Sequence, residues 1–194
     1  SRIGIKWFAS VLDIPSYEYL KKFKLERIKL PSTISEHKEL LAHVAKDYRG
    51  EVVISTGLTD LDYEEFIIDL FANCKALFLL QCTSSYPCAL EDAHIGIVRH
   101  YSKLSTKYAF IKAGYSSHDI GAFGCQLAVA AGAVMIEKHV KMGTVGWAHF
   151  DDVALDLSTN EFANFVSQLR LARTAVKDEI KTIKSSEHHK YWKN

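Results

Sequence analysis

The chain has 194 residues with a formal net charge of +1, and 48% of its residues are hydrophobic and 24% are charged. This composition is typical of a well-packed soluble domain. The near-neutral charge gives no electrostatic basis for binding nucleic acid or a membrane surface, and no apolar run approaches the roughly 18 residues of a transmembrane helix.

Short apolar runs alternate with amphipathic stretches along the chain. Such runs, bounded by polar or glycine-containing turns, predict strands, and continuously apolar ones are typical of parallel strands covered on both faces. The predicted strands are residues 3–11, 27–30, 52–55, 76–81, 108–113 and 134–140.

The stretches between these strands have the periodicity of helices. After residue 57, apolar side chains recur at helical spacing at Tyr63, Phe66 and Ile67, and residues 158–161 have the pattern of a capping box that starts a helix at Ser158. Repeated strand–helix units predict a parallel α/β fold, either a barrel or a doubly wound sheet. No glycine-rich dinucleotide or P-loop motif occurs, which weakens the nucleotide-binding interpretations.

Polar residues gather where the predicted strands end. In a parallel barrel these carboxyl ends meet at one face, where active sites lie. We therefore expect a single site at that face. Its candidate residues are Ser10, Lys29, Ser32, Ser55, Ser84, Tyr86, Ser116, His118 and His139.

Strand alternation adds charged groups to this site. Glu137 and His139 share one face of their strand, as do Arg27 and Lys29, and buried ionisable groups need partners. For Glu137 we expect an internal salt bridge to Arg27 or Lys29. For Lys29, which sits beside serines at the mouth, we expect an anionic ligand.

Two histidines end consecutive predicted strands. His118 and His139 are 21 residues apart, and two imidazoles with substrate oxygens and water suit Mn²⁺, Mg²⁺ or Zn²⁺. If they share an ion, their rings should lie about 3–5 Å apart. The alternative is a pair of unrelated loop histidines in a chain that has nine.

Four motifs resemble, in order and spacing, the N-acetylneuraminate (sialic acid) synthase barrel. They are residues 54–57 (ISTG), 81–87 (QCTSSYP), 114–119 (GYSSHD) and 136–139 (IEKH), with weaker matches at residues 8–13 and 27–32. The resemblance runs from about Gly4 to Ala172. It implies a partial TIM (β/α)8-type barrel of six βα units, strands three to eight of the family barrel, over residues 1–180, with residues 181–194 as a polar tail.

The resemblance also implies a reaction, the condensation of phosphoenolpyruvate with an N-acetylhexosamine-type aldehyde to give a nonulosonic acid and phosphate. His118 and His139 would hold Mn²⁺ or Mg²⁺, and Asp152 would contact the amino sugar. Lys29 and Tyr86 would join the two histidines as catalytic residues. By the same resemblance, the residues expected to bind phosphoenolpyruvate are Ser10, Lys29, Ser32, Ser55, Ser84, Tyr86 and Ser116.

Departures from the family pattern leave alternatives open. Ser117 replaces a usual aspartate, Ser84 replaces a usual asparagine, and the loop at residues 141–151 is slightly longer, so the sugar acceptor is not fixed. The alternatives are a related barrel aldolase or isomerase with another acceptor, or a non-catalytic sugar-phosphate-binding or assembly subunit.

Parts of the family protein have no counterpart in this sequence. They are the first two strands, with a substrate-binding glutamate and lysine, and the C-terminal antifreeze-like domain. Six strands cannot close an eight-stranded barrel without exposed edges. We therefore expect a missing wall, or one supplied by a homodimer partner or another chain.

Four cysteines are present, and none forms a C-x-x-C pair. This usage indicates reduced thiols rather than a disulfide framework. No signal-peptide pattern opens the sequence. Together these features predict a cytoplasmic protein.

Overall fold

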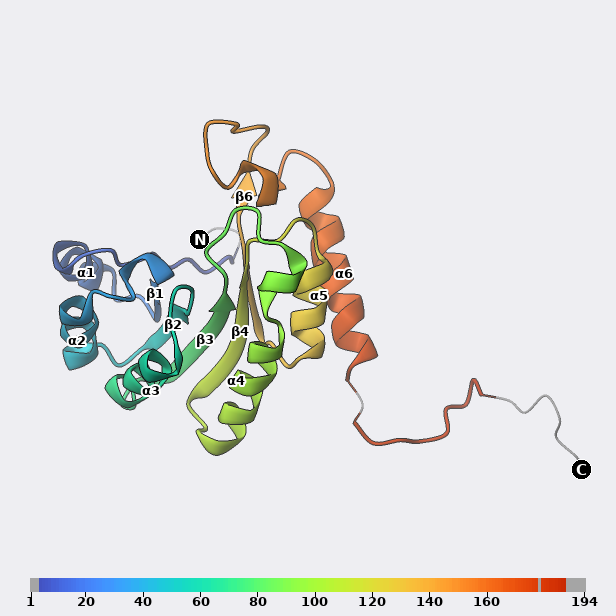
Figure 1. Cartoon of the computed structure of the whole chain (residues 1–194), viewed down its shortest axis with the longest axis horizontal. Helices are drawn as coiled ribbons and strands as arrows, with labels where there is room; N and C mark the ends of the chain where they lie inside the picture. Colours follow the sequence, from blue (N-terminus) through green and yellow to red (C-terminus); the bar gives the residue numbers. More distant parts are fainter. Residues whose placement is uncertain (1–3, 178, 188–194) are drawn as a thin grey trace, which may run out of the picture.

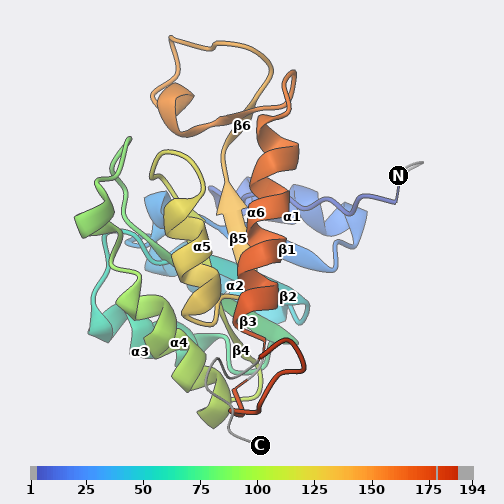
Figure 2. The same ribbon diagram turned by 90° about the vertical axis from the view of Figure 1, so that its right-hand side faces the viewer.

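A parallel five-stranded sheet forms the centre of the computed structural model, which describes residues 4–177 and 179–187. The order of the strands in the sheet is their order in the chain, and every neighbouring pair is parallel. The sheet curls into a half-barrel with helices around its outside (Figures 1 and 2). The strands are β1 (Arg27–Leu30), β2 (Glu51–Ser55), β3 (Ala76–Cys82), β4 (Ile111–Ser117) and β5 (Met135–Lys138).

Helices connect successive strands, so the predicted strand–helix alternation is confirmed. The helices are α1 (Ile14–Leu20), α2 (Lys38–Asp47), α3 (Leu61–Leu70), α4 (Gly96–Lys107), α5 (Phe123–Ala130) and α6 (Glu161–Ala175). Single 3-10 turns occur at η1 (Lys21–Phe23), η2 (Ser32–Ile34), η3 (Leu90–Ala93) and η4 (Asp151–Val153). No helix of the described ranges is long and apolar enough to cross a membrane.

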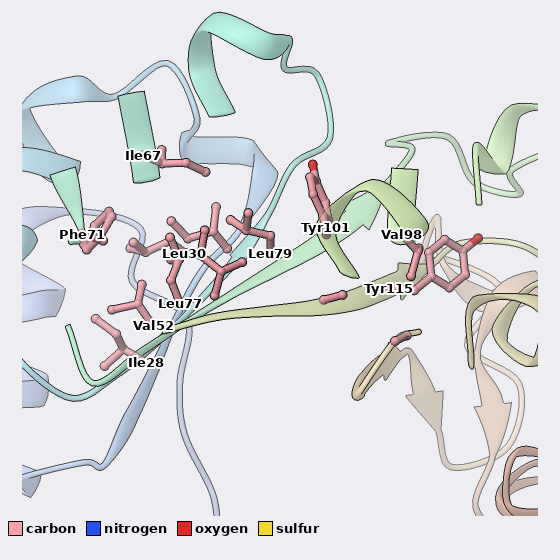
Figure 3. Close-up of a cluster of buried hydrophobic side chains, with 14 of the residues drawn as sticks. Ile28, Leu30, Val52, Ile67, Phe71, Leu77, Leu79, Val98, Tyr101 and Tyr115 are labelled. Carbon is pink, nitrogen blue, oxygen red and sulfur yellow. The ribbon is translucent and has the colours of Figure 1, made fainter. Parts of the chain in front are cut away.

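Strand alternation divides the sheet into two faces. One face carries fully buried aliphatic residues such as Ile28, Val52 and Leu77, which pack against helix residues such as Ile67 and Phe71 (Figure 3). The residues of opposite parity point to the concave side of the half-barrel. They include Lys29, Ser55 and Ser116, so several buried polar residues are on the inner face, and most of the apolar core lies under the helices.

The predicted helix after residue 57 is confirmed as α3. Asp60 caps it by accepting a hydrogen bond from the backbone N–H of Tyr63 at 3.0 Å. The predicted capping box at residues 158–161 is wrong. Helix α6 begins at Glu161, and the Glu161 carboxylate instead accepts from the backbone N–H of Asp156 at 2.6 Å.

Two predicted strands differ from the structure. Of the predicted strand at residues 3–11, residue 3 lies outside the described residues, and the rest forms only an isolated bridge between Ser10 and Lys29. The predicted strand at residues 134–140 divides into β5 and β6 (Val140–Lys141), and β6 pairs with β7 (Leu155–Asp156) in a separate sheet. The main sheet therefore has five strands, and the count of six is not confirmed.

The barrel wall is open, as expected from the sequence. Within the described ranges, β5 pairs only with β4, and β1 has β2 on one side and the single Ser10 bridge on the other. Apolar side chains lie exposed beside both edges, including Trp7 at 56% and Val134 at 62% exposure. The sheet thus has two edges with unused hydrogen-bonding groups.

Candidate functional site

A cavity of about 280 Å³ lies at the carboxyl ends of the five strands, on the concave side of the sheet. Parallel strands bring residues distant in the chain together at this edge. The predicted site residues that line it are Ser10, Lys29, Ser32, Ser55, Tyr86, Ser116, His118 and His139. The prediction that strand-end residues share one site therefore agrees with the geometry for eight positions.

Two predicted site residues lie elsewhere. Ser84 lines an adjoining hollow between α3 and η3, although its hydroxyl is only 3.2 Å from that of Ser32, which lines the cavity. Asp152 is exposed on η4 and does not line the cavity. Its neighbour Asp151 holds the loop by accepting from Lys141 Nζ at 2.9 Å and from the Val145 N–H at 2.7 Å.

Lys29 is the cation at the base of the cavity. It is 4% exposed, and its Nζ donates to the Ser55 hydroxyl and, at 2.8 Å, to Glu137 Oε1. The predicted salt bridge of Glu137 is confirmed with Lys29. Arg27 instead pairs with Glu51 on the neighbouring strand, at 2.9 Å from Nε.

The Glu137 carboxylate stays ionised in this setting. Burial alone would raise its pKa, but the charge of Lys29 and hydrogen bonds from Lys29 and Ser116 outweigh burial, and the net pKa of Glu137 is lowered. An ammonium group has three donors, and Ser55 and Glu137 use two. In the described part of the chain, a third Lys29 N–H thus remains for a ligand oxygen.

The two histidines lie on the opposite side of the same cavity. The ring centroids of His118 and His139 are 5.5 Å apart, slightly more than the expected range, and their planes differ by 33°. His118 Nδ1 lies 2.8 Å from the Thr83 carbonyl oxygen, which can only accept. Nδ1 therefore carries the hydrogen, and Nε2 keeps the lone pair that a metal ligand needs.

Both imidazoles are held neutral. Burial lowers the pKa of His118, and burial together with the nearby His118 lowers the pKa of His139. Neutral rings with one nitrogen available fit a divalent ion. The described residues contain no group of three or more histidine, cysteine or acidic side chains around one point, so an ion here would complete its coordination with substrate or water.

Aromatic rings close the histidine side of the cavity. The Tyr86 ring lies 3.9 Å from the His118 ring and 5.7 Å from that of His139, centroid to centroid. Phe150 stacks on His139 at 4.8 Å with a plane angle of 6°, and His149 meets Tyr86 edge-on at 4.7 Å. Burial raises the pKa of Tyr86 to about 12, so its hydroxyl is a neutral donor.

Besides Pro31, Thr33 and Cys82, which also line the cavity, four further neighbours of the site were not among the predicted residues. His149 and Phe150 belong to the loop after the last strand, where an aromatic run was the available signal. Ser117 and Lys138 also border the cavity, although their polar side-chain atoms bond to each other on the helix-facing side of the sheet. Each is a polar residue of a buried strand whose parity directs its side chain toward the helices. Such a buried polar side chain requires hydrogen-bond partners, and this pattern could have revealed both residues.

Comparison with known proteins gives matches along most of the chain. The sequence profile of the NeuB family matches residues 1–181. The N-acetylneuraminate-9-phosphate synthase of Mus musculus is 31% identical over 182 residues, which are 93% of this chain and 49% of that protein. A pseudaminic acid synthase of Campylobacter jejuni is 30% identical over 178 residues, which are 90% of this chain and 50% of that protein.

A solved structure is similar in fold as well. It is the N-acetylneuraminic acid (sialic acid) synthetase of Leptospira borgpetersenii in complex with citrate, with a TM-score of 0.82 and 27% identity. The match covers 95% of this chain and 63% of that one. The chain therefore spans about half the length of the curated relatives it matches.

Proposed function

This chain belongs to the NeuB family, and we propose that it carries the phosphoenolpyruvate- and metal-binding side of a nonulosonic acid synthase. The relatives are synthases of N-acetylneuraminate 9-phosphate and pseudaminic acid, which supports a condensation-type reaction for this chain. The observation that carries the proposal is one cavity in which a buried lysine with serine hydroxyls faces two neutral imidazoles.

The lysine side of the cavity suits the anionic substrate. The third donor of Lys29 and the hydroxyls of Ser32, Ser55 and Ser116 would hold the phosphate and carboxylate oxygens of phosphoenolpyruvate. Ser10 lies beside these donors because its backbone forms a β-bridge with Lys29. Ser84 lies next to them because its hydroxyl contacts that of Ser32. Glu137 orients the Lys29 ammonium group through their hydrogen bond.

The histidine side suits an electrophile. His118 and His139 would hold Mn²⁺ or Mg²⁺, and the chemistry that such an ion supplies when bound is Lewis-acid polarisation of an aldehyde oxygen. The hydrogen bond to the Thr83 carbonyl selects the required tautomer of His118, and stacking on Phe150 fixes the orientation of the His139 ring. The Tyr86 ring lies against both imidazoles, and its hydroxyl is neutral because burial raises its pKa to about 12.

The proposed reaction joins the substrates across the cavity. The enol carbon of phosphoenolpyruvate, held from Lys29, attacks the aldehyde carbon of the sugar; water then adds to the adjacent cationic carbon and phosphate leaves. The hydroxyl and ammonium donors around Lys29 stabilise the departing phosphate. Asp152 is exposed and lies outside the cavity, so it would reach the sugar only if loop residues 141–151 turned toward the cavity.

We propose an N-acetylhexosamine-type aldehyde as the acceptor, in keeping with the sugar acids after which the relatives are named. The open sheet edges support completion of the barrel by a second copy or another chain. A reducing, cytoplasmic setting is in keeping with four buried free thiols.

The test is phosphate release from phosphoenolpyruvate in the presence of Mn²⁺ and a panel of N-acetylhexosamines, with binding of phosphoenolpyruvate measured separately by calorimetry. We expect saturable binding by the chain and loss of binding in Lys29→Met. Lys112→Met, a half-buried lysine at the far end of β4, is the matched control. A folded chain that does not bind phosphoenolpyruvate would refute the proposal, and binding without turnover would favour the non-catalytic alternative.

A further inference from the structure

Behind the two histidines, on the helix-facing side of β4 and β5, lies a second group of buried polar residues. The hydroxyls of Tyr115 and Ser117 both donate to Asp119 Oδ1, at 2.8 and 2.7 Å. Tyr115 is 1% exposed, Ser117 1% and Asp119 3%. These bonds tie together the residues on either side of His118, so the backbone that carries His118 is fixed from behind.

Lys138 connects this group to the next strand. Its Nζ donates to the Ser117 hydroxyl at 2.8 Å and to the Asp119 backbone carbonyl. Lys138 and Ser117 are partners in the register of β4 and β5. Because Lys138 directly precedes His139, its two hydrogen bonds link the chain at one histidine to both neighbours of the other.

The Asp119 side chain has little room to move. A Cβ atom added at Gly124, in the first turn of α5, would lie only 2.6 Å from Asp119 Oδ2. Oδ2 is also the one buried side-chain oxygen or nitrogen of the described residues without a hydrogen-bond partner. Asp119 is therefore held by packing on one side and by Tyr115 and Ser117 on the other.

We propose that Lys138 is a positioning residue that sets the separation and orientation of His118 and His139, acting through Ser117 and Asp119. The inference rests on the proposed function, in which these histidines hold a divalent ion. Both hydrogen bonds of the Lys138 ammonium group lie on the helix-facing side of the sheet, behind the two imidazoles. Its effect on a ligand is therefore geometric.

The test is Lys138→Met, which keeps the length of the side chain and removes its donors. Partners behind a ligand histidine contribute about 10–100-fold to metal affinity, so we expect Mn²⁺ affinity, measured by the electron paramagnetic resonance signal of the free ion, to fall by about that factor. Phosphoenolpyruvate affinity, measured by calorimetry, should stay within about twofold because Lys29 is untouched. Lys112→Met, with its Nζ on the Ala109 carbonyl, should change neither affinity.

A Lys138→Met protein that folds and binds Mn²⁺ like the wild type would overturn the assignment, and so would an equal loss of both affinities. If Lys138→Met does not fold, Ser117→Ala removes the same link with less loss of volume and should give the same selective loss of Mn²⁺. If the wild type binds no Mn²⁺, the proposed metal role fails, but crystal structures still decide the positioning role. The 5.5 Å separation of the imidazole centroids should then change in the variant, and an unchanged separation would refute it.

Discussion

The ammonium group of Lys29 on β1 lies 2.8 Å from the carboxylate of Glu137 on β5, so one ion pair joins the first and last strands of the open sheet. The two strands are separated along the sheet by β2, β3 and β4. The pair therefore spans the concave side and holds the curvature that brings the lysine and histidine sides of the cavity together.

The first prediction concerns the stability that this pair provides. Lys29→Met leaves Glu137 without its cation, and breaking a buried pair typically costs about 3–5 kcal/mol. Because the Glu137 side chain is 37% exposed, we expect a smaller loss of about 2 kcal/mol in the free energy of unfolding, measured with urea. Lys29→Met combined with Glu137→Gln should recover part of it. A double variant no more stable than Lys29→Met would contradict the pairing.

The second prediction separates the metal ligands from the phosphate site. His118→Ala and His139→Ala should each lower Mn²⁺ affinity by about 100-fold or more, because only two protein ligands are present at the proposed site. Phosphoenolpyruvate binding in the absence of metal should change little. His43→Ala, at a half-buried histidine paired with Glu18, is the control. Wild-type Mn²⁺ affinity in both site variants would eliminate the metal assignment.

The third prediction concerns pH and the cysteines. Burial raises the pKa of both Cys74 and Cys125 to about 11, so these thiols are protonated at about pH 8. A thiol reagent should react slowly with the folded chain, and it should react rapidly with all four cysteines in denaturant. The folded pKa values of the two thiols exceed their unfolded ones, so their burial in the protonated form favours the folded state. This contribution to the free energy of unfolding is complete below about pH 8.5 and falls as pH rises toward 11. Rapid labelling of the folded protein would contradict the burial.

The fourth prediction tests the packing of Asp119. Gly124→Ala adds a methyl group against the Asp119 carboxylate, so we expect a loss of about 1–3 kcal/mol in thermal or urea unfolding, despite alanine's helix propensity. Gly96→Ala, in the first turn of α4 with no atom within 4 Å of the added Cβ, should be neutral or slightly stabilising. Equal effects at the two glycines would refute the close contact.

Strand alternation was the most informative part of the sequence. It placed Lys29 and Glu137 on one inner face, because side-chain direction in a strand depends only on parity. The position of polar residues at the strand ends grouped eight of the predicted site residues around one cavity. The parts that failed depend on contacts that a sequence does not contain. Residues 4–11 are apolar enough for a strand but, within the described chain, form a β-bridge only at Ser10, and Glu161 bonds the backbone of Asp156 instead of capping a helix.

Loop geometry explains the remaining differences at the site. Asp152 and Asp151 are adjacent, and only the bonds from Lys141 and Val145 decide which of them is turned inward to the loop. Ser84 lines a neighbouring hollow, and its hydroxyl meets that of Ser32 at the border of the main cavity. In contrast, Lys138 was detectable in principle, since a charged side chain at the helix-facing parity of a buried strand must have partners.

The open wall gives the backbone amides of the sheet unequal lifetimes against exchange with deuterium. Strand β3 is paired on both sides and carries fully buried residues such as Leu77 and Leu79, so its amides should exchange most slowly. Strand β5 is paired only with β4 within the described ranges, and half of its backbone groups face outward. Amide exchange should therefore become faster from β3 toward β5. If another strand pairs with β5, the amides of β5 should show the largest slowing of exchange.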